Sequence, residues 1–269
     1  MHLPKALQNG LIGATAVLFV GSRFIPGGDE SGPVLSAAVA MVSGPSDASA
    51  AVPAPVNEAV LENTRSALEA FAEVVRPLSH PKALETAFRS YFAFKAEHPH
   101  KVTKPYLYFV DYGMPSTAKR GYVFDMETRR VVEGPFTVAH GRGSRERGGI
   151  PTLFSNRPGS AATSLGLYVA QETYAFRGTA GGRRYSSIGL RLAGVSGEYN
   201  NKARMRGVVA HGAPYVTSSR AGRSEGCTAM EQARSRRLLP RLANGGMVFL
   251  FAPERDWMTD DPWVVASSE

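Results

Sequence analysis

The stretch from Val208 to Met230 reads VVAHGAPYVTSSRAGRSEGCTAM and contains the only cysteine of the chain, Cys227, sixteen positions after His211. A glycine precedes Cys227 and a helix-compatible run follows it, which predicts a thiol at the N-terminal end of a helix. The thiolate is the reactive form of cysteine, and both a helix N-terminus and a neighbouring imidazolium lower the pKa of a thiol. The stretch therefore predicts a cysteine nucleophile, with His211 as its imidazole partner, in an acyl-transfer enzyme.

Nucleophilic catalysis by cysteine needs a base and hydrogen-bond donors for the oxyanion. The predicted strand GVVAH ends at His211, where a strand meets a loop, so this histidine is the candidate base. Gly226 has no Cβ, so its N–H group and that of Cys227 can approach a developing oxyanion closely. Two further side chains are placed to hold a carboxylate or a carbonyl: Arg223 and Ser224. The alternative is that Cys227 is a small buried hydrophobe, as most free cysteines are.

Upstream of this stretch the chain has the texture of β-strands. Aromatic and β-branched runs read YLYFVDY, GYVFDM and RVVEGPFTVAH from Tyr106 onward, with turn residues between them, and predict an antiparallel meander. Further short strands are predicted at 164–169, 187–192, 207–211 and 247–251. A helix is predicted from Ala229 to Leu242, although Pro240 is expected to distort or shorten it. The pattern predicts a mostly β (α+β) domain over residues 101–255, followed by a C-terminal tail at 256–269.

Apolar residues recur at helical spacing from Asn57 until Pro77 ends the run. A second periodic run, with several aromatic residues, follows Pro81, which suits the first turn of a helix. These two runs predict a helical hairpin over residues 57–100, ahead of the main domain.

The N-terminal segment has the pattern of an export signal. Lys5 precedes the apolar run LIGATAVLFV, which has the length of a signal-peptide core and is short for a membrane span. Residues 1–26 are therefore predicted to be a signal peptide or, alternatively, an uncleaved membrane anchor. Residues 27–56 are rich in Gly, Pro, Ser and Ala and are predicted to be a disordered linker.

Composition excludes some function classes. The 269 residues are 43% hydrophobic and 20% charged, as in a globular protein. The formal charge of +8 is spread over several arginine-containing segments with no basic stripe interleaved with aromatic residues, which argues against a nucleic-acid partner. One cysteine excludes an internal disulfide. His98 and His100 have no partner histidine or cysteine at metal-ligand spacing, so no metal site is expected there.

A family resemblance rests on several motifs in order. His211-Gly212, followed after a loop by Arg223-Ser224-Glu225-Gly226-Cys227, resembles the signature of the YkuD-type L,D-transpeptidases, which carry His, a spacer, then Ser or Thr, His, Gly and Cys. Upstream stretches resemble the murein L,D-transpeptidase catalytic domain family: Val138-Ala139-His140-Gly141, Phe154-Ser155-Asn156, Ser164-Leu165-Gly166 with Tyr168, Glu172-Thr173-Tyr174, and Asn200 before Arg206-Gly207. The resemblance covers residues 104–253.

The resemblance implies a YkuD-like catalytic domain, a sandwich or barrel-like β structure, and export to the periplasm or cell envelope. It implies that Cys227 attacks the carbonyl that joins the third residue of a peptidoglycan stem peptide, usually diaminopimelate, to the terminal D-alanine. An amine from another stem peptide then resolves the thioester. Carried over by position, His211 is the general base, the carbonyl of Gly212 orients its imidazole, and the N–H groups of Gly226 and Cys227 hold the oxyanion. No cofactor is implied.

Three further residues are candidates for contact with the substrate: His140, Tyr168 and Asn156. The alternative to substrate binding is a purely structural role for each of them, at a strand end, in the core or in a loop. Glu225 departs from the pattern, because the family has histidine there and an ionised glutamate cannot donate a hydrogen bond. Hydrolysis of the thioester by an L,D-carboxypeptidase or endopeptidase is therefore one alternative function. A catalytically silent module that binds peptidoglycan is another.

Overall fold

A mixed eight-stranded sheet forms the centre of the fold, with the strand order β11-β9-β8-β7-β12-β1-β2-β3. The computed structural model describes residues 58–265, all within one compact unit. The strands of this sheet are β1 (Tyr106–Asp111), β2 (Gly121–Asp125), β3 (Arg130–Phe136), β7 (Gly166–Ala180), β8 (Arg183–Gly194), β9 (Val209–Gly212), β11 (Thr228–Met230) and β12 (Met247–Phe251). Two small sheets pair β4 (His140–Gly141) with β10 (Arg223–Ser224), and β5 (Glu146–Arg147) with β6 (Ile150–Pro151).

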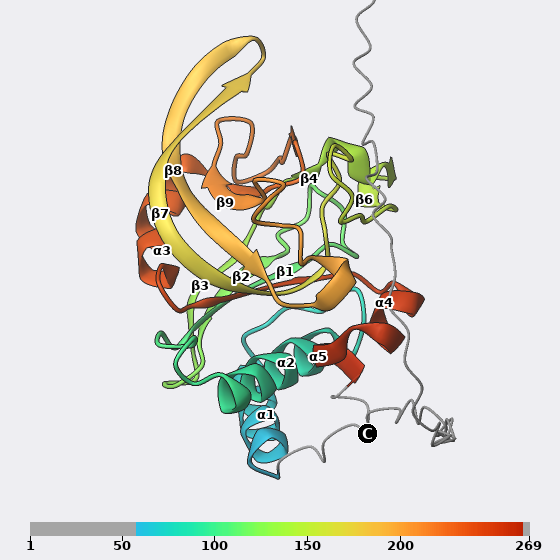
Figure 1. The fold of residues 1–269 in the computed structure, drawn as a ribbon, viewed down its shortest axis with the longest axis vertical. Helices are drawn as coiled ribbons and strands as arrows, with labels where there is room; N and C mark the ends of the chain where they lie inside the picture. Colours follow the sequence, from blue (N-terminus) through green and yellow to red (C-terminus); the bar gives the residue numbers. More distant parts are fainter. Residues whose placement is uncertain (1–57, 266–269) are drawn as a thin grey trace, which may run out of the picture. The chain divides into compact units, whose positions relative to one another are not determined.

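The middle of the large sheet is apolar on both faces. Every residue of β12, MVFLF, is buried, as expected for a strand covered on both sides. It runs parallel to β1 and antiparallel to β7. The predicted β1–β2–β3 meander is confirmed, because both of its pairings are antiparallel. The α+β class is also confirmed, and the barrel-like part takes the form of one strongly curved sheet (Figure 1).

The β7–β8 hairpin is much longer than the two short strands predicted at 164–169 and 187–192. It curves beyond the rest of the sheet and over β9 (Figure 1). Gly181 and Gly182 form its tip with φ angles of 54° and 76°, and such positive values in both central residues suit a two-residue hairpin turn. A register shift between Ala170 and Thr173 interrupts the pairing, and a bulge of this kind bends a strand. The hairpin thereby reaches the neighbourhood of His211.

Two helices precede the sheet, α1 (Glu58–Phe71) and α2 (Ala83–Glu97), and the predicted hairpin is confirmed. The Phe71 ring lies 5.4 Å from that of Phe88 and 4.7 Å from that of Phe124 on β2, measured between centroids. The hairpin therefore shares one hydrophobic core with the sheet instead of forming a core of its own.

The C-terminal segment was predicted to be a tail, and that prediction is wrong up to residue 265. Two short helices follow, α4 (Arg255–Asp260) and α5 (Pro262–Val265); α5 packs against α2, and α4 packs against α5 (Figure 1). Trp257 is buried, and its Nε1 donates a hydrogen bond to Asp261 at 2.8 Å. The indole ring and this buried carboxylate fix the segment to the core.

The helix predicted at 229–242 is shorter than expected. Helix α3 spans Gln232–Leu242, because residues 228–230 pair with β9 as strand β11. It packs against β8 and β9 and continues for two residues beyond Pro240, which is exposed. Short 3-10 turns occupy Arg142–Ser144 and Gly197–Tyr199.

The predictions for residues 1–26 and 27–56 lie outside the described residues. Within residues 58–265, none of the helices has both the length and the apolar composition needed to cross a membrane.

Candidate active site

Adjacent parallel strands bring Cys227 and His211 onto one face of the sheet. Strand β11 pairs with β9 so that Ala229 lies opposite His211. By extension of this register, Cys227, just before β11, lies opposite Val209. Paired residues of parallel strands share a face, and so do alternate residues of one strand, so the Cys227 and His211 side chains emerge on the same side. The Sγ atom of Cys227 lies 3.8 Å from the carbonyl oxygen of Gly207.

This placement corrects the prediction of a thiol at a helix N-terminus. A strand follows Cys227 directly, and α3 begins only at Gln232. The dipole of a helix therefore does not act on the sulfur at close range, since that effect falls off within the first turn.

The imidazole of His211 is held by two contacts. Its Nδ1 atom lies 3.1 Å from the carbonyl oxygen of Gly212. A carbonyl only accepts hydrogen bonds, so this contact assigns the proton to Nδ1 and leaves a lone pair on Nε2. The ring stacks on Phe176 of β7, with centroids 4.1 Å apart and planes at 14°. His211 is therefore a buried neutral base with a defined tautomer.

Burial favours the uncharged forms of His211 and Cys227. It lowers the pKa of His211 to about 4, an effect that the bond to Gly212 opposes. It raises the pKa of Cys227 to about 11, although a backbone hydrogen bond from Val209 and the positive charge of Arg206 act in the opposite direction. The expectation of a thiol pKa depressed by imidazolium is therefore wrong. A protonated thiol and a neutral imidazole are the resting pair, which suits proton transfer during attack.

Ser224 stabilises the turn that carries the cysteine. Its hydroxyl donates to the carbonyl of Cys227 at 2.6 Å and accepts from the N–H of Gly226 at 3.2 Å. Gly226 has φ of +113°, and a Cβ there would lie 2.9 Å from the carbonyl oxygen of Ala162. These contacts correct two predictions: the Ser224 hydroxyl is occupied within the turn, and the Gly226 N–H is occupied instead of being free for an oxyanion.

Glu225 turns away from the turn and pairs with Arg142, whose Nε lies 2.8 Å from its Oε1. Both side chains are exposed. The carboxylate therefore does not take the place of a histidine ring as a donor.

The predicted substrate residues Arg223 and His140 belong to a cluster of internal contacts. Arg223 forms an ion pair with Glu146 and donates to Ser116 at 3.2 Å. His140 is buried, and its Nδ1 lies 2.9 Å from Nη2 of Arg120. Burial, and then the positive charges of Arg120 and Arg223, lower the pKa of His140 to about 3. These contacts support the structural alternative for His140 and engage Arg223 with Glu146.

Tyr168 and Asn156 are also placed by internal contacts. Tyr168 is completely buried, and its hydroxyl donates to the carbonyl of Ser164 at 2.8 Å, so direct contact with a substrate is excluded. Asn156 donates to the Glu198 carbonyl at 2.9 Å and to Oδ1 of Asn201 at 2.8 Å. It lines a hollow that neither Cys227 nor His211 lines.

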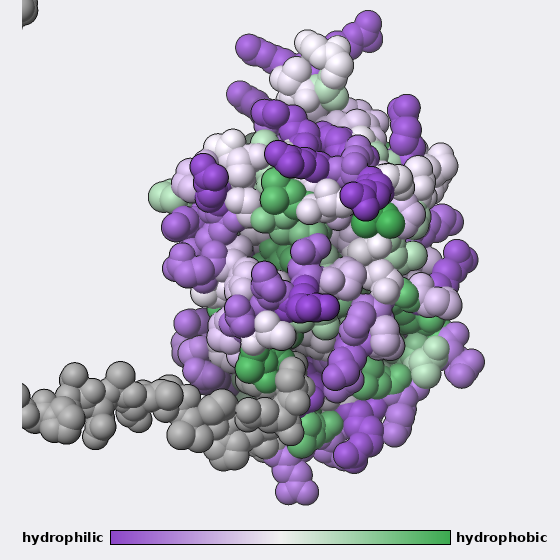
Figure 2. Space-filling view, turned by 90° about the vertical axis from the view of Figure 1, so that its right-hand side faces the viewer, coloured by the Kyte–Doolittle hydropathy of each residue, from purple (hydrophilic) through white to green (hydrophobic). Residues whose placement is uncertain are grey.

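Figure 2 shows the side of the molecule that carries β4 and β6 in Figure 1. Hydrophilic side chains cover most of this face, and apolar ones lie deeper between them. The hollow beside Asn156 is likewise lined by both apolar and polar side chains, the apolar ones including Phe154, Leu165 and Trp257.

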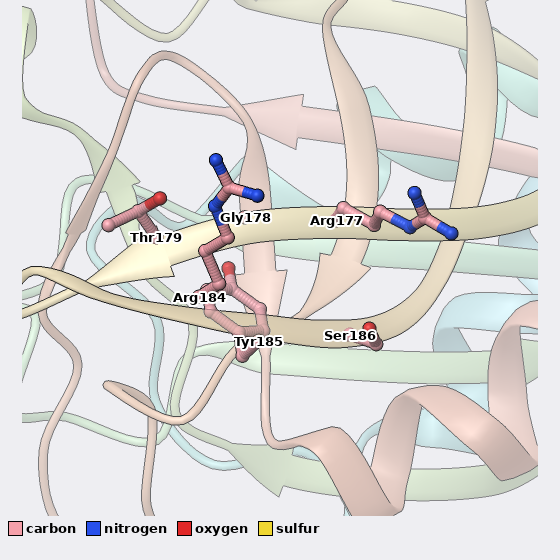
Figure 3. Close-up of a pocket in the computed structure, with 6 residues that line it drawn as sticks. All are labelled: Arg177, Gly178, Thr179, Arg184, Tyr185 and Ser186. Carbon is pink, nitrogen blue, oxygen red and sulfur yellow. The ribbon is translucent and has the colours of Figure 1, made fainter.

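Further aromatic residues near His211 come from the β7–β8 hairpin and from the loop after β9, and of these only Tyr174 belongs to a motif quoted from the sequence. Tyr174, Phe176 and Tyr185 occupy positions that share a face of the hairpin, and the Tyr185 ring meets that of Tyr215 edge-on at 6.5 Å. The Tyr215 ring likewise meets His211 at 6.5 Å. The alternation of aromatic and polar residues in β7 was the sequence signal for this aromatic face. The opposite face near the hairpin tip carries Arg177, Thr179, Arg184 and Ser186, which line an open hollow together with Gly178 and Tyr185 (Figure 3).

Comparisons with known proteins identify the family of this chain. The profile of the YkuD-type family described as L,D-transpeptidase catalytic domain matches residues 76–251. Among solved structures, an L,D-transpeptidase from Mycobacterium smegmatis is 15% identical with a TM-score of 0.35, and the match covers 55% of this chain and 59% of that one. An L,D-transpeptidase from Stackebrandtia nassauensis is 14% identical with a TM-score of 0.35, over 75% of this chain and 97% of that one. The chain thus spans about three fifths of the Mycobacterium protein.

A search of curated proteins finds no match. The family profile, however, spans well over half of the 269 residues and includes both His211 and Cys227. The chain therefore belongs to the L,D-transpeptidase catalytic domain family.

Proposed function

We propose that this protein is an exported murein L,D-transpeptidase that forms a thioester at Cys227 with His211 as general base. Its substrate is a peptidoglycan stem peptide, from which it releases the terminal D-alanine. Family membership and the signal-like run at the N-terminus support action in the periplasm or cell envelope. No cofactor takes part in the proposed reaction.

The observation that carries the proposal is the tautomer of His211. Because Nδ1 donates to Gly212 at 3.1 Å, Nε2 is left as the basic atom of the ring. The ring lies on the strand beside Cys227 and on the same face. A weak nucleophile next to an oriented base is the arrangement required for covalent catalysis.

In the first half-reaction, the proton of the Cys227 thiol moves to Nε2 of His211 while the sulfur attacks the carbonyl carbon of the third stem residue. The tetrahedral intermediate collapses with loss of the C–N bond, and the imidazolium returns its proton to the amine of D-alanine. In the second half-reaction an acceptor amine attacks the thioester and gives its proton to His211. The C–S bond breaks, and the proton passes back to the sulfur.

Conversion of muropeptides tests the proposal. The purified protein from residue 57 onward is incubated with disaccharide tetrapeptides, and D-alanine and the muropeptide products are separated by chromatography. We expect cross-linked dimers and free D-alanine from the wild type, and neither from Cys227→Ala. His211→Gln should lose at least 100-fold in rate, since general base catalysis contributes about 10²- to 10⁴-fold. The matched control His100→Gln, at an exposed position, should keep the wild-type rate.

Other products would assign another function. Tripeptide monomers with free D-alanine would show hydrolysis of the same thioester by water. Binding of the tetrapeptide without any product, equal in wild type and Cys227→Ala, would identify a silent binding module. Either result would contradict transpeptidation.

A further inference from the structure

Arg206 is a cation that the loop at 160–164 holds in place. Its Nη2 donates to the carbonyl of Ala162 at 2.8 Å and to the hydroxyl of Ser160 at 3.1 Å, and its Nη1 reaches the hydroxyl of Ser164 at 3.3 Å. Three hydrogen bonds to one loop hold the guanidinium in a single orientation. A charge that is already oriented loses little conformational entropy when it binds an anion.

Two contacts bring the segment of Arg206 close to the segment of Cys227. The carbonyl of Gly207, the next residue, lies 3.8 Å from the sulfur of Cys227. The Ala162 carbonyl that accepts a hydrogen bond from Arg206 also packs closely against Gly226, the residue before Cys227. A Cβ atom added to Gly226 would lie only 2.9 Å from this carbonyl oxygen. The guanidinium and the sulfur thus flank the same short piece of backbone, and the positive charge of Arg206 acts on the thiol.

The charge of Arg206 has no acidic partner among residues 58–265. Arg204, two positions earlier, pairs with Glu172 at the surface. Arg223 pairs with Glu146, and Arg142 pairs with Glu225. The Arg206 side chain enters no ion pair of the described part of the chain. A guanidinium has five N–H donors, so its three hydrogen bonds leave two for a ligand.

We propose that Arg206 binds the free C-terminal carboxylate of the residue that leaves during acylation, and thereby selects acyl donors that end one residue after the scissile bond. The inference rests on the proposed function, because it assumes a peptide carbonyl at Cys227. In such a donor the carboxylate is three covalent bonds from the carbonyl carbon that the sulfur attacks. A cation beside the sulfur is therefore within reach of it. In a donor that is extended by a further residue or amidated at its end, a neutral amide replaces this carboxylate.

Acylation of Cys227 by two matched donors tests the proposal. One is a stem tetrapeptide with a free C-terminal carboxylate, and the other is the same peptide with a carboxamide. The rate of adduct formation is measured by intact-mass spectrometry under single-turnover conditions and expressed as kcat/KM. Wild type should favour the carboxylate donor by about 10- to 100-fold, the range for hydrogen bonds to a charged group.

The variants separate recognition from other roles. Arg206→Gln should slow the carboxylate donor by the same factor, leave the carboxamide donor unchanged, and so abolish the preference. Arg206→Lys should keep part of it. The control Arg204→Gln should behave as wild type.

Equal slowing of both donors by Arg206→Gln would overturn the proposal, because it would show that the charge acts on the thiol alone. Equal rates of wild type with the two donors would also overturn it, without any variant. If wild type formed no adduct with either donor, the proposed function would fail. The inference would then be decided by calorimetry on Cys227→Ala, where loss of the carboxylate should weaken binding only when Arg206 is present.

Discussion

Lowering the pH from 7 to 5 is expected to destabilise the fold through two buried histidines. His140 and His211 have pKa values lowered to about 3 and about 4, in each case chiefly by burial. In the unfolded chain each has its ordinary value, roughly 6.5. The unfolded state therefore binds protons that the folded state excludes. The stability that these groups provide is complete above the unfolded pKa and is lost as the pH falls below it.

The magnitude follows from the interval between the two pKa values. At pH 5 both imidazoles are still neutral in the folded protein, whereas both are protonated in the unfolded chain. The pH lies about 1.5 below the unfolded pKa, so each histidine costs about 2 kcal/mol of folding free energy, and the pair about 4 kcal/mol. Below pH 4 the loss through His211 levels off, because the folded state then takes up the proton too.

Urea unfolding followed by tryptophan fluorescence measures this loss. Asp111 and Asp261, whose pKa values burial raises, stabilise the fold as the pH falls, so the comparison of variants isolates the histidines. Between pH 7 and 5, His140→Gln and His211→Gln should each lose about 2 kcal/mol less than wild type. The control His100→Gln should follow wild type. Identical pH dependence of wild type and His211→Gln would refute the account of a buried neutral base.

Three substitutions test the surroundings of the pair. Ser224→Ala removes both hydrogen bonds of the turn and should lower the free energy of unfolding by about 1–3 kcal/mol. We expect a lower midpoint of thermal unfolding and slower acylation, and an unchanged midpoint would show that Ser224 does not stabilise the turn. Gly212→Ala puts a Cβ 2.2 Å from the Ser235 hydroxyl and 2.9 Å from Cα of Gln232. This crowding should lower the free energy of unfolding in urea by about 1–3 kcal/mol. An unchanged free energy would show that α3 can move away. Glu225→Gln should leave stability unchanged and lower the pKa of Cys227, because the negative charge of Glu225 raises that pKa. The rate of alkylation by iodoacetamide should then rise at a lower pH than in wild type, and identical pH profiles would contradict this influence of Glu225.

Local patterns predicted what depends on local sequence. The aromatic and β-branched runs identified β1 and β2, a short strand was predicted where β12 lies, and the helical spacing identified α1 and α2. The ordered motifs identified the family, which the profile match confirms. The catalytic roles of His211 and Cys227 stay predictions.

Features that depend on distant contacts were missed. Residues 229–230 have a helix-compatible sequence, but pairing with β9 overrides it. The internal contacts of Arg206 were missed because its partners in the loop at 160–164 are more than forty positions away. Tyr168 shows the converse: it was a candidate for contact with the substrate, but its hydroxyl is satisfied within the core by Ser164. Burial by distant segments cannot be read from neighbouring residues alone.

The most direct test of the central claim is the mass of the protein after a brief exposure to a stem tetrapeptide. The account predicts an adduct equal to the tetrapeptide minus D-alanine, located at Cys227 by peptide mapping and removed by hydroxylamine as a thioester. It also predicts no adduct on Cys227→Ala and a much slower one on His211→Gln. Release of D-alanine at the wild-type rate by Cys227→Ala would contradict the account.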